Sequence, residues 1–282
     1  MTATRAFKQV DVFTSVPLMG NPVAVILDAE GLSTETMQAM ANWTNLSETT
    51  FVTPATDPAA DYAVRIFTPR SELPFAGHPT LGTAHAVIEA GLAAFNDGKI
   101  VQQCAVGLVE VSQSGTGLSF RLPRYSFENA PDVDCLAVAL GDGAIVGNPQ
   151  IVDVGPRWVI AELASVAVLE ALSPNLASLA HYDRKHHTTG LTVFATGQEG
   201  ALTVRSFAPA DGVAEDPVCG SGNAAVAAFR LQLGQIAADS RYSVSQGRQV
   251  GRDGKVQVRI QGDSIHVGGE CVTVMEGSVR LP

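Results

Sequence analysis

The stretches RIFTP (residues 65–69) and RSFAP (residues 205–209) repeat one pattern at an offset of 140 residues. Each is typical of a β-strand that ends at a proline. The match continues at an offset of 143 residues, where Glu72, Pro74, Gly77 and Gly91 correspond to Glu215, Pro217, Gly220 and Gly234. An offset of about half of a 282-residue chain indicates an internal duplication, and the length suits two domains.

A helix follows the strand in each copy. In the first copy a helix is predicted over residues 79–90, because Pro79 suits a first helical turn and Gly91 supplies a left-handed stop. In the second copy the run over residues 224–233 is apolar nearly all round, which is typical of a buried helix. Its predicted start is Ser221 or Gly222, and its end is Gly234.

The repeat therefore predicts an α+β fold of two pseudo-symmetric domains with a cleft between the halves. Ahead of the first repeat, we expect a hairpin of residues 10–13 and 22–27, and then a helix over residues 34–43 that Ser33 caps. The second half echoes this opening with strands at residues 151–154 and 158–161 and a helix over residues 166–172. A polar, glycine-rich turn at residues 112–117 places the domain border near residue 115.

Composition excludes several classes of protein. Apolar residues make up 46% of the chain and charged residues 16%, which is typical of a globular protein. A net charge of -10 disfavours nucleic acid and anionic membrane surfaces as partners. The longest apolar runs are far shorter than a membrane span, and no signal peptide is recognisable, so a cytoplasmic protein with no membrane contact is expected. In a reducing cytosol, Cys104, Cys135, Cys219 and Cys271 would remain thiols.

Two helix N-termini, at residues 77–78 and 220–221, are the first candidates for a binding site. Free backbone N–H groups and the positive end of the helix dipole favour a carboxylate, so we expect a small anionic substrate. The alternative is that Gly77 and Gly220 only form tight turns.

Glu48 is the favoured general base, because it lies just before the apolar strand predicted at residues 50–53. Partial desolvation there would raise its pKa toward the value that acid/base catalysis needs. The alternative is an ordinary exposed glutamate. Asp216, before Pro217, would bind a substrate amine or hydroxyl, or else stabilise a turn. His78 would relay a proton or hold a carboxylate, or else be structural.

Cys219 immediately precedes the second helix start, where a helix N-terminus would lower the pKa of a thiol. Its counterpart in the first copy is Ala76, so a symmetrical two-thiol racemase is disfavoured. The alternative is a small buried apolar residue.

Two further motifs resemble a cofactor or metal site but are interpreted as structural. Gly141-Asp142-Gly143 followed by Gly147 imitates a dinucleotide loop, but the full GxGxxG is missing and turns are expected. His186 and His187 are expected in a polar loop without the spacing of a metal site.

Four motifs occur in order along the chain: GNPVAV (20–25), SETTF (47–51), FAGHPT (75–80) and EDPVCGS (215–221). Together they resemble the PhzF-like family of phenazine biosynthesis isomerases. The resemblance implies a diaminopimelate epimerase-like fold, in which each of two domains wraps a curved, mainly antiparallel sheet around a central helix. It also implies that the last strands return to the first domain. The expected domains are residues 1–115 with 270–282, and residues 116–269.

The family's best-known activity isomerises trans-2,3-dihydro-3-hydroxyanthranilate without a cofactor, and a glutamate moves the proton. The resemblance thus implies a cofactor-independent isomerase of a small carboxylate, without a metal and as a homodimer, in which Glu48 has that role. The other residues expected around the substrate are His78, Asp216 and Ser221 in catalysis, and Gly77, Gly220, Asn21 and Cys219 in binding.

One motif departs from the family pattern. Many members read Asp-Pro-x-Thr-Gly-Ser-Ala where this chain has Cys219 and Gly222, and Cys-Gly-Ser-Gly looks like a thiol motif of the epimerase relatives. Two alternatives therefore stay open. One is an amino-acid epimerase or racemase that uses Glu48 and Cys219, and the other is a non-catalytic protein that binds a small ligand or a partner.

Overall fold

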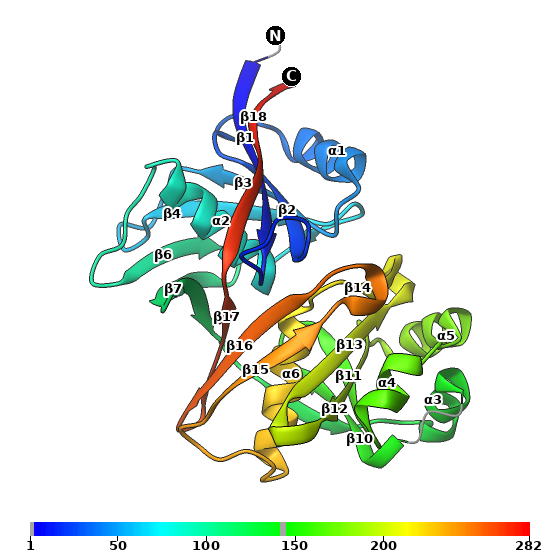
Figure 1. Ribbon diagram of the computed structural model, residues 1–282. Helices are drawn as coiled ribbons and strands as arrows, with labels where there is room; N and C mark the ends of the chain where they lie inside the picture. The colour runs from blue at the N-terminus through cyan, green and yellow to red at the C-terminus, as the bar shows by residue number, and fades with distance from the viewer. Residues whose placement is uncertain (1–2, 142–144) are drawn as a thin grey trace. The chain divides into compact units, whose positions relative to one another are not determined.

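The computed structural model describes residues 3–141 and 145–282, which divide into two units (Figure 1). The first unit joins Met1–Arg121 to Gly268–Pro282, and the second comprises Leu122–Val267. Both units combine helices with mainly antiparallel strands, so the predicted α+β class is confirmed. In the described part of the chain, no helix has the length and apolar character needed to span a membrane.

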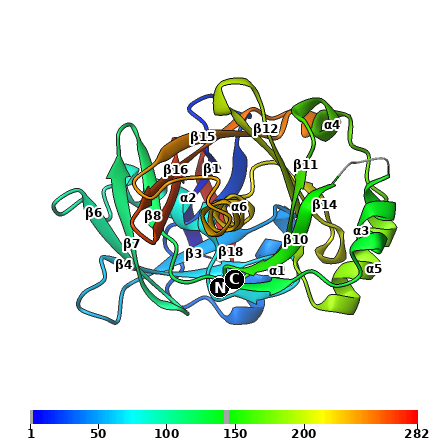
Figure 2. The ribbon, with the colours of Figure 1, turned by 90° about the horizontal axis from the view of Figure 1, so that it is seen from below.

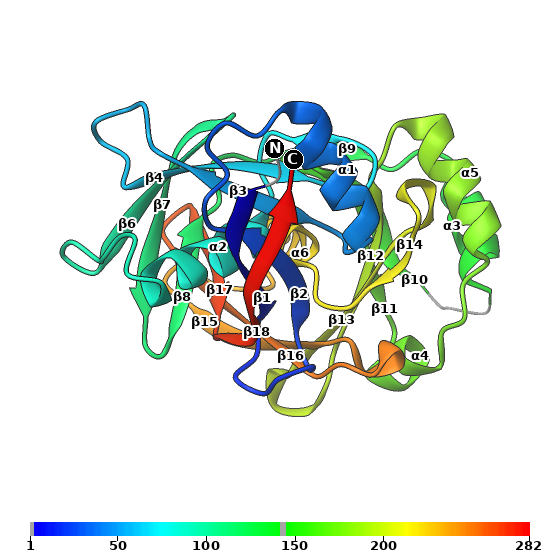
Figure 3. The ribbon, with the colours of Figure 1, turned by 90° about the horizontal axis from the view of Figure 1, so that it is seen from above.

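The first unit contains the N-terminal strands and the last strand. Its helices are α1 (Thr34–Thr44) and α2 (Gly77–Glu89). Its strands are β1 (Ala3–Val12), β2 (Asn21–Ile26), β3 (Thr49–Thr53), β4 (Tyr62–Phe67), β5 (Glu72–Leu73), β6 (Lys99–Cys104), β7 (Gly107–Ser114), β8 (Gly117–Arg121) and β18 (Cys271–Leu281). Strand β18, at the end of the chain, lies directly beside β1, at its start (Figure 3). The two strands pair antiparallel, from Ala3 opposite Leu281 to Val12 opposite Cys271.

The second unit contains the remaining elements. Its helices are α3 (Val133–Leu140), α4 (Val166–Ala171), α5 (Leu176–His186) and α6 (Gly220–Gln232), with short 3-10 helices η1 (Gln198–Gly200), η2 (Pro209–Asp211) and η3 (Arg248–Val250). Its strands are β9 (Ser126–Asn129), β10 (Ile145–Asp153), β11 (Arg157–Leu163), β12 (Gly190–Thr196), β13 (Leu202–Ala208), β14 (Val213–Asp216), β15 (Arg241–Gln246), β16 (Gly254–Gln261) and β17 (Ser264–Gly269), whose last residues belong to the first unit.

The duplication seen in the sequence is a duplication of strand pairings. In the first unit β1 and β2 pair antiparallel, β2 and β3 parallel, β3 and β4 antiparallel, and β4 and β6 parallel. In the second unit β10 and β11, β11 and β12, β12 and β13, and β13 and β15 repeat this order of orientations. Each set surrounds a central helix, α2 or α6, and Figure 2 shows α6 end-on among its strands.

The central helices are buried because small and apolar residues occupy most of their positions. Both begin earlier than predicted. Helix α2 begins at Gly77, since the carbonyl of Ala76 already accepts the N–H of Thr80, and α6 begins at Gly220. Gly91 and Gly234 have left-handed φ angles of 68° and 66°, as their predicted role as helix stops requires.

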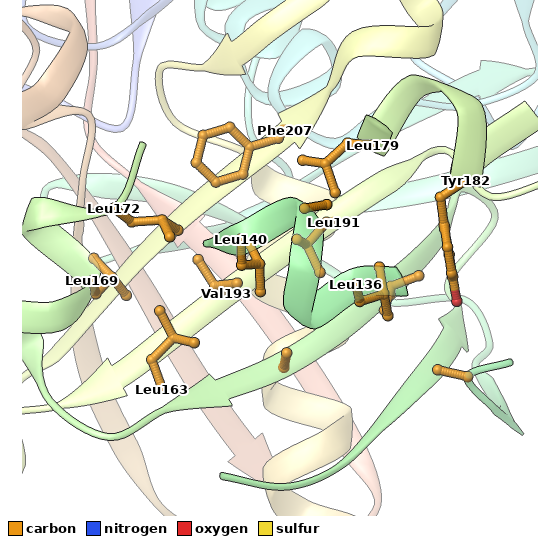
Figure 4. Close-up of a cluster of buried hydrophobic side chains, with 14 of the residues drawn as sticks. Leu136, Leu140, Leu163, Leu169, Leu172, Leu179, Tyr182, Leu191, Val193 and Phe207 are labelled. Atoms are coloured by element: carbon orange, nitrogen blue, oxygen red, sulfur yellow. The ribbon is translucent and has the colours of Figure 1, made fainter. Parts of the chain in front are cut away.

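The outer helices cover the other face of each set of strands. In the first unit α1, which Ser33 caps as predicted, packs Met37, Met40 and Ala41 into a core with residues of β2 and β3. In the second unit α3, α4 and α5 form a larger apolar cluster with β12 (Figure 4). Its labelled members include Leu136, Leu140, Leu169, Leu179, Leu191 and Val193. These cores hold the strands whose ends carry the candidate site residues.

The glycine motif at residues 141–147 and the pair His186–His187 lie in different surroundings. Residues 142–144 are outside the described residues, and Gly147 lies within β10, with a φ of 68° where the register with β11 shifts. The prediction of a polar loop at residues 186–187 is wrong, because His186 ends α5 and His187 is its left-handed C-cap. Nε2 of His186 lies 3.0 Å from Oδ2 of Asp132, so the ring is held by a contact with this carboxylate.

Candidate active site

His78 lies in the first turn of α2, between Asn21 and Glu48. Nδ2 of Asn21 is 3.4 Å from Nδ1 of His78, and Oε2 of Glu48 is 3.4 Å from Nε2. Because an amide N–H can only donate, Nδ1 is assigned as the acceptor, and Nε2, which faces Glu48, is the ring nitrogen that carries a proton. Asn21 is fully buried behind the ring, where it orients the imidazole.

Glu48 immediately precedes β3, and its side chain is only 16% exposed. Burial raises the pKa of its carboxyl to about 7, against a smaller lowering by the Ser47 hydroxyl. The desolvation expected from the sequence is therefore present. At neutral pH such a carboxyl is populated in both protonation states, which suits a group that both takes and returns a proton.

A buried polar network fixes the first turns of α2 against the strands. The Thr83 hydroxyl donates to Thr50 at 2.8 Å, and Nε2 of Gln102 donates to the Thr80 hydroxyl at 3.0 Å. Oε1 of Gln102 in turn accepts from the Tyr62 hydroxyl at 3.2 Å. These bonds hold the turn that carries Gly77 and His78, so they set the position of the imidazole.

In the second unit Cys219 is the N-cap of α6, and its Sγ accepts the N–H of Gly222 at 3.2 Å. The predicted lowering of its pKa is wrong. Burial, with a smaller contribution from the charge of Asp216, raises the pKa of this thiol well above its usual range. The favourable helix terminus does not compensate for the loss of water, so Cys219 is a neutral thiol in this fold.

Ser221, in the first turn of α6, is half-buried, and its Oγ accepts a hydrogen bond from Nε1 of Trp158 at 3.0 Å. Sγ of Cys219 lies 3.6 Å from the same oxygen. Trp158 was expected from the sequence only as a strand residue. Its contact with Ser221 comes from the packing of β11 against α6, which no local pattern predicts.

Asp216 ends β14, and its Oδ1 accepts the N–H of Val218 at 3.1 Å, as the turn-stabilising alternative requires. Gln246 holds the same loop from β15. Its Nε2 donates to the carbonyl of Asp216 at 3.1 Å, and its Oε1 accepts from the N–H of Cys219 at 3.2 Å and from Nδ2 of Asn223 at 2.8 Å. Gln246 is a further residue that sequence reasoning missed.

The sequence-predicted residues thus form two groups, each at the N-terminus of a central helix. The first unit brings together Asn21, Glu48, Gly77 and His78. The second unit brings together Asp216, Cys219, Gly220 and Ser221. Chemically, the first group can exchange a proton, and the second offers N–H and O–H donors to an anion.

Known proteins resemble this chain along nearly its whole length. Residues 10–277 match the family PhzC-PhzF, a phenazine biosynthesis-like protein. The chain is 38% identical to Antisense-enhancing sequence 1 of Schizosaccharomyces pombe, over 96% of this chain and 97% of that protein. It is 35% identical to trans-2,3-dihydro-3-hydroxyanthranilate isomerase of Pseudomonas chlororaphis, over 96% and 98%. The crystal structure of a PhzF-family phenazine biosynthesis protein from Bacillus anthracis matches with a TM-score of 0.86 at 25% identity, over 98% of this chain and 99% of that one.

Proposed function

The chain belongs to the PhzC-PhzF family, and from this premise we propose that it is an isomerase that moves a proton between two carbons of a small carboxylate. The observation that carries the proposal is the buried Glu48 carboxyl beside Nε2 of His78. The name of the Pseudomonas chlororaphis relative supplies the first substrate to test, trans-2,3-dihydro-3-hydroxyanthranilate. A biosynthetic role, a homodimer and a cytoplasmic location belong to the same proposal.

In this mechanism the ionised carboxylate of Glu48 removes a proton from a carbon beside the unsaturated system of the substrate. The electron pair left on carbon spreads into that conjugated system, so the step needs no cofactor or metal. Glu48 then returns the proton to a second carbon on the same face, and a double bond shifts. The Nε2–H of His78 faces Oε2 of Glu48 and holds the carboxyl in place between the two transfers.

The second unit supplies binding groups in this proposal. The N–H groups at the start of α6 and the hydroxyl of Ser221 donate to the substrate carboxylate. The carboxylate of Asp216 accepts from the amine or hydroxyl of the substrate. Cys219 acts as a helix cap and not as a base, because a buried neutral thiol is a poor proton acceptor at neutral pH.

The test is proton NMR in deuterium oxide with trans-2,3-dihydro-3-hydroxyanthranilate. We expect the wild type to convert it, and Glu48→Gln to lose at least about a thousandfold in rate while still binding the substrate. Glu110→Gln is the matched control, because it makes the same chemical change in an exposed ion pair with Lys99. A Glu48→Gln enzyme that keeps a tenth of the wild-type rate would contradict the mechanism.

A panel of amino acids in the same NMR experiment tests the epimerase alternative. Deuterium entering an amino-acid α-carbon, and failing to enter in Cys219→Ala, would favour that alternative. The burial of the thiol leads us to expect no such exchange. Sedimentation of the wild type checks the proposed homodimer.

A further inference from the structure

Trp158 is a nearly buried indole that lies against Gly190, a position without a side chain. Only 3% of the residue is exposed. It pairs with Gly190 across the parallel strands β11 and β12, and a Cβ at position 190 would come within 2.9 Å of Cζ3 of the indole. Gly190 therefore leaves the space that the ring occupies. In this position the N–H of the indole points at Oγ of Ser221, at 3.0 Å.

The hydroxyl of Ser221 has a limited set of hydrogen bonds to make. A serine hydroxyl offers one O–H donor and two acceptor lone pairs. The indole N–H of Trp158 uses one lone pair. Sγ of Cys219 lies 3.6 Å from the same oxygen and already accepts the N–H of Gly222. Either atom of this sulfur–oxygen contact can be the donor, so the lone pair of Oγ whose use is fixed is the one that accepts the indole N–H.

We propose that Trp158 is a positioning residue: its indole N–H occupies one lone pair of the Ser221 hydroxyl and turns the O–H of Ser221 away from the indole, toward a carboxylate oxygen of the substrate. This inference rests on the proposed function, which places Ser221 at the substrate. Because the indole N–H approaches Oγ, the O–H of the half-buried hydroxyl points away from the ring, and we assign a carboxylate oxygen of the substrate as its acceptor.

Calorimetric binding of 3-hydroxyanthranilate, a stable aromatic analogue of the proposed substrate, tests the inference without turnover. We expect Trp158→Phe to weaken binding about tenfold, and Ser221→Ala to weaken it at least as much. The double variant should bind no more weakly than Ser221→Ala, because Trp158 acts through Ser221. Trp43→Phe is the matched control, because Trp43 is 81% exposed and should leave binding within twofold.

A shape-preserving replacement keeps the test decisive if Trp158→Phe fails to fold. Replacement of Trp158 by 3-benzothienylalanine exchanges the indole N–H for sulfur and retains the two fused rings. We expect the same loss of affinity as for Trp158→Phe, with a thermal midpoint close to that of the wild type. Unchanged binding in this variant overturns the inference. Losses for Trp158→Phe and Ser221→Ala that multiply in the double variant overturn it as well.

The carboxylate is tested with 2-aminophenol, which lacks it. We expect Trp158→Phe to leave the binding of 2-aminophenol unchanged, and an equal loss for both ligands overturns the assignment of the carboxylate. Wild-type enzyme that binds 3-hydroxyanthranilate but does not convert trans-2,3-dihydro-3-hydroxyanthranilate contradicts the proposed function alone. Wild-type enzyme that binds no 3-hydroxyanthranilate overturns the inference on Trp158.

Discussion

The two units share a framework but differ in the chemistry at the helix that each one surrounds. In the first unit Arg65 donates two hydrogen bonds of 2.7 Å to Glu72, and its guanidinium lies 5.1 Å from the ring centre of Phe67. The same arrangement in the second unit is formed by Arg205, Glu215 and Phe207. Because ion pair and ring contact recur together, they belong to the duplicated framework.

A second shared feature is a buried glutamine that contacts the first turn of the central helix. Gln102 contacts Thr80 in α2, and Gln246 contacts Asn223 in α6, and the two contacted helix residues correspond at the offset of 143 residues. The helix caps differ, since Ala76 offers no side-chain cap and Cys219 caps α6 with its sulfur. The duplicated framework thus positions two helix termini, and a buried carboxyl beside an imidazole, Glu48 with His78, lies at the first of them. This difference argues against a symmetrical two-base mechanism.

The ion pairs give the largest expected effect, because the two copies differ in burial. The side chains of Arg205 and Glu215 are 5% and 10% exposed, and those of Arg65 and Glu72 are 33% and 37% exposed. Arg205→Met leaves a buried carboxylate unpaired and should lower the free energy of unfolding by about 3–5 kcal/mol. Arg65→Met should cost about 0–1 kcal/mol. Urea unfolding measures both, and equal losses would contradict this account of the two copies.

The pH dependence of catalysis separates Glu48 from the other carboxyls. Burial raises its pKa to about 7, and the proposed mechanism starts from the ionised form. Log kcat/KM should therefore fall with a slope of one below about pH 7, which is about a hundredfold over two pH units. Initial rates between pH 5 and 9 test this. A profile that stays flat through pH 7, or that rises toward acid, would show that the carboxylate of Glu48 is not the base.

Asp183 is a buried carboxyl in the second unit whose pKa is also raised, to about 6, chiefly by burial. Its Oδ1 accepts from the Thr188 hydroxyl at 2.8 Å within the α5 region. A folded-state pKa above the unfolded value means stability that is complete below about pH 4 and is lost as the pH rises through about 6. Asp183→Asn should therefore gain about 3 kcal/mol over the wild type as the pH rises from 4 to 8.

Thermal or urea unfolding of Asp183→Asn at several pH values measures this gain. The activity of the variant should stay within twofold of the wild type, because Asp183 lies outside both groups of candidate site residues. A difference in stability that does not change with pH would mean that Asp183 is ionised throughout this range. A large loss of activity in Asp183→Asn would instead show that Asp183, like Glu48, contributes to the reaction.

Local signals in the sequence predicted much of the fold and part of the candidate site. The Ser33 cap and the stop at Gly91 follow from the chemistry of a few neighbouring residues, and the structure confirms both. The partial desolvation of Glu48 follows from its place before an apolar strand. The start of α2 at Gly77 was harder to predict, because Ala76 caps it without a side-chain hydrogen bond.

The remaining features depend on strand pairing and on burial. Trp158 meets Ser221 because β11 packs against α6, and the two residues are far apart in the sequence. Gln246 lies in β15, which follows α6 in the sequence, but its side chain contacts the loop that precedes α6. For Cys219 the sequence left two interpretations open, and the structure confirms the small buried residue, because burial raises the pKa of the thiol where a helix terminus alone would lower it.

The smallest expected effect concerns Cys219, at the position where the two helix caps differ. Cys219→Ser keeps a side-chain acceptor for the N–H of Gly222 and a donor for Ser221, so kcat and stability should stay close to the wild type. Cys219→Ala removes the cap and should cost about 1 kcal/mol in unfolding free energy, with KM rising about threefold and kcat unchanged. Steady-state kinetics beside urea unfolding of both variants measures this. A loss of kcat in both would make the thiol itself part of the reaction, and the second unit would then share the proton chemistry of the first.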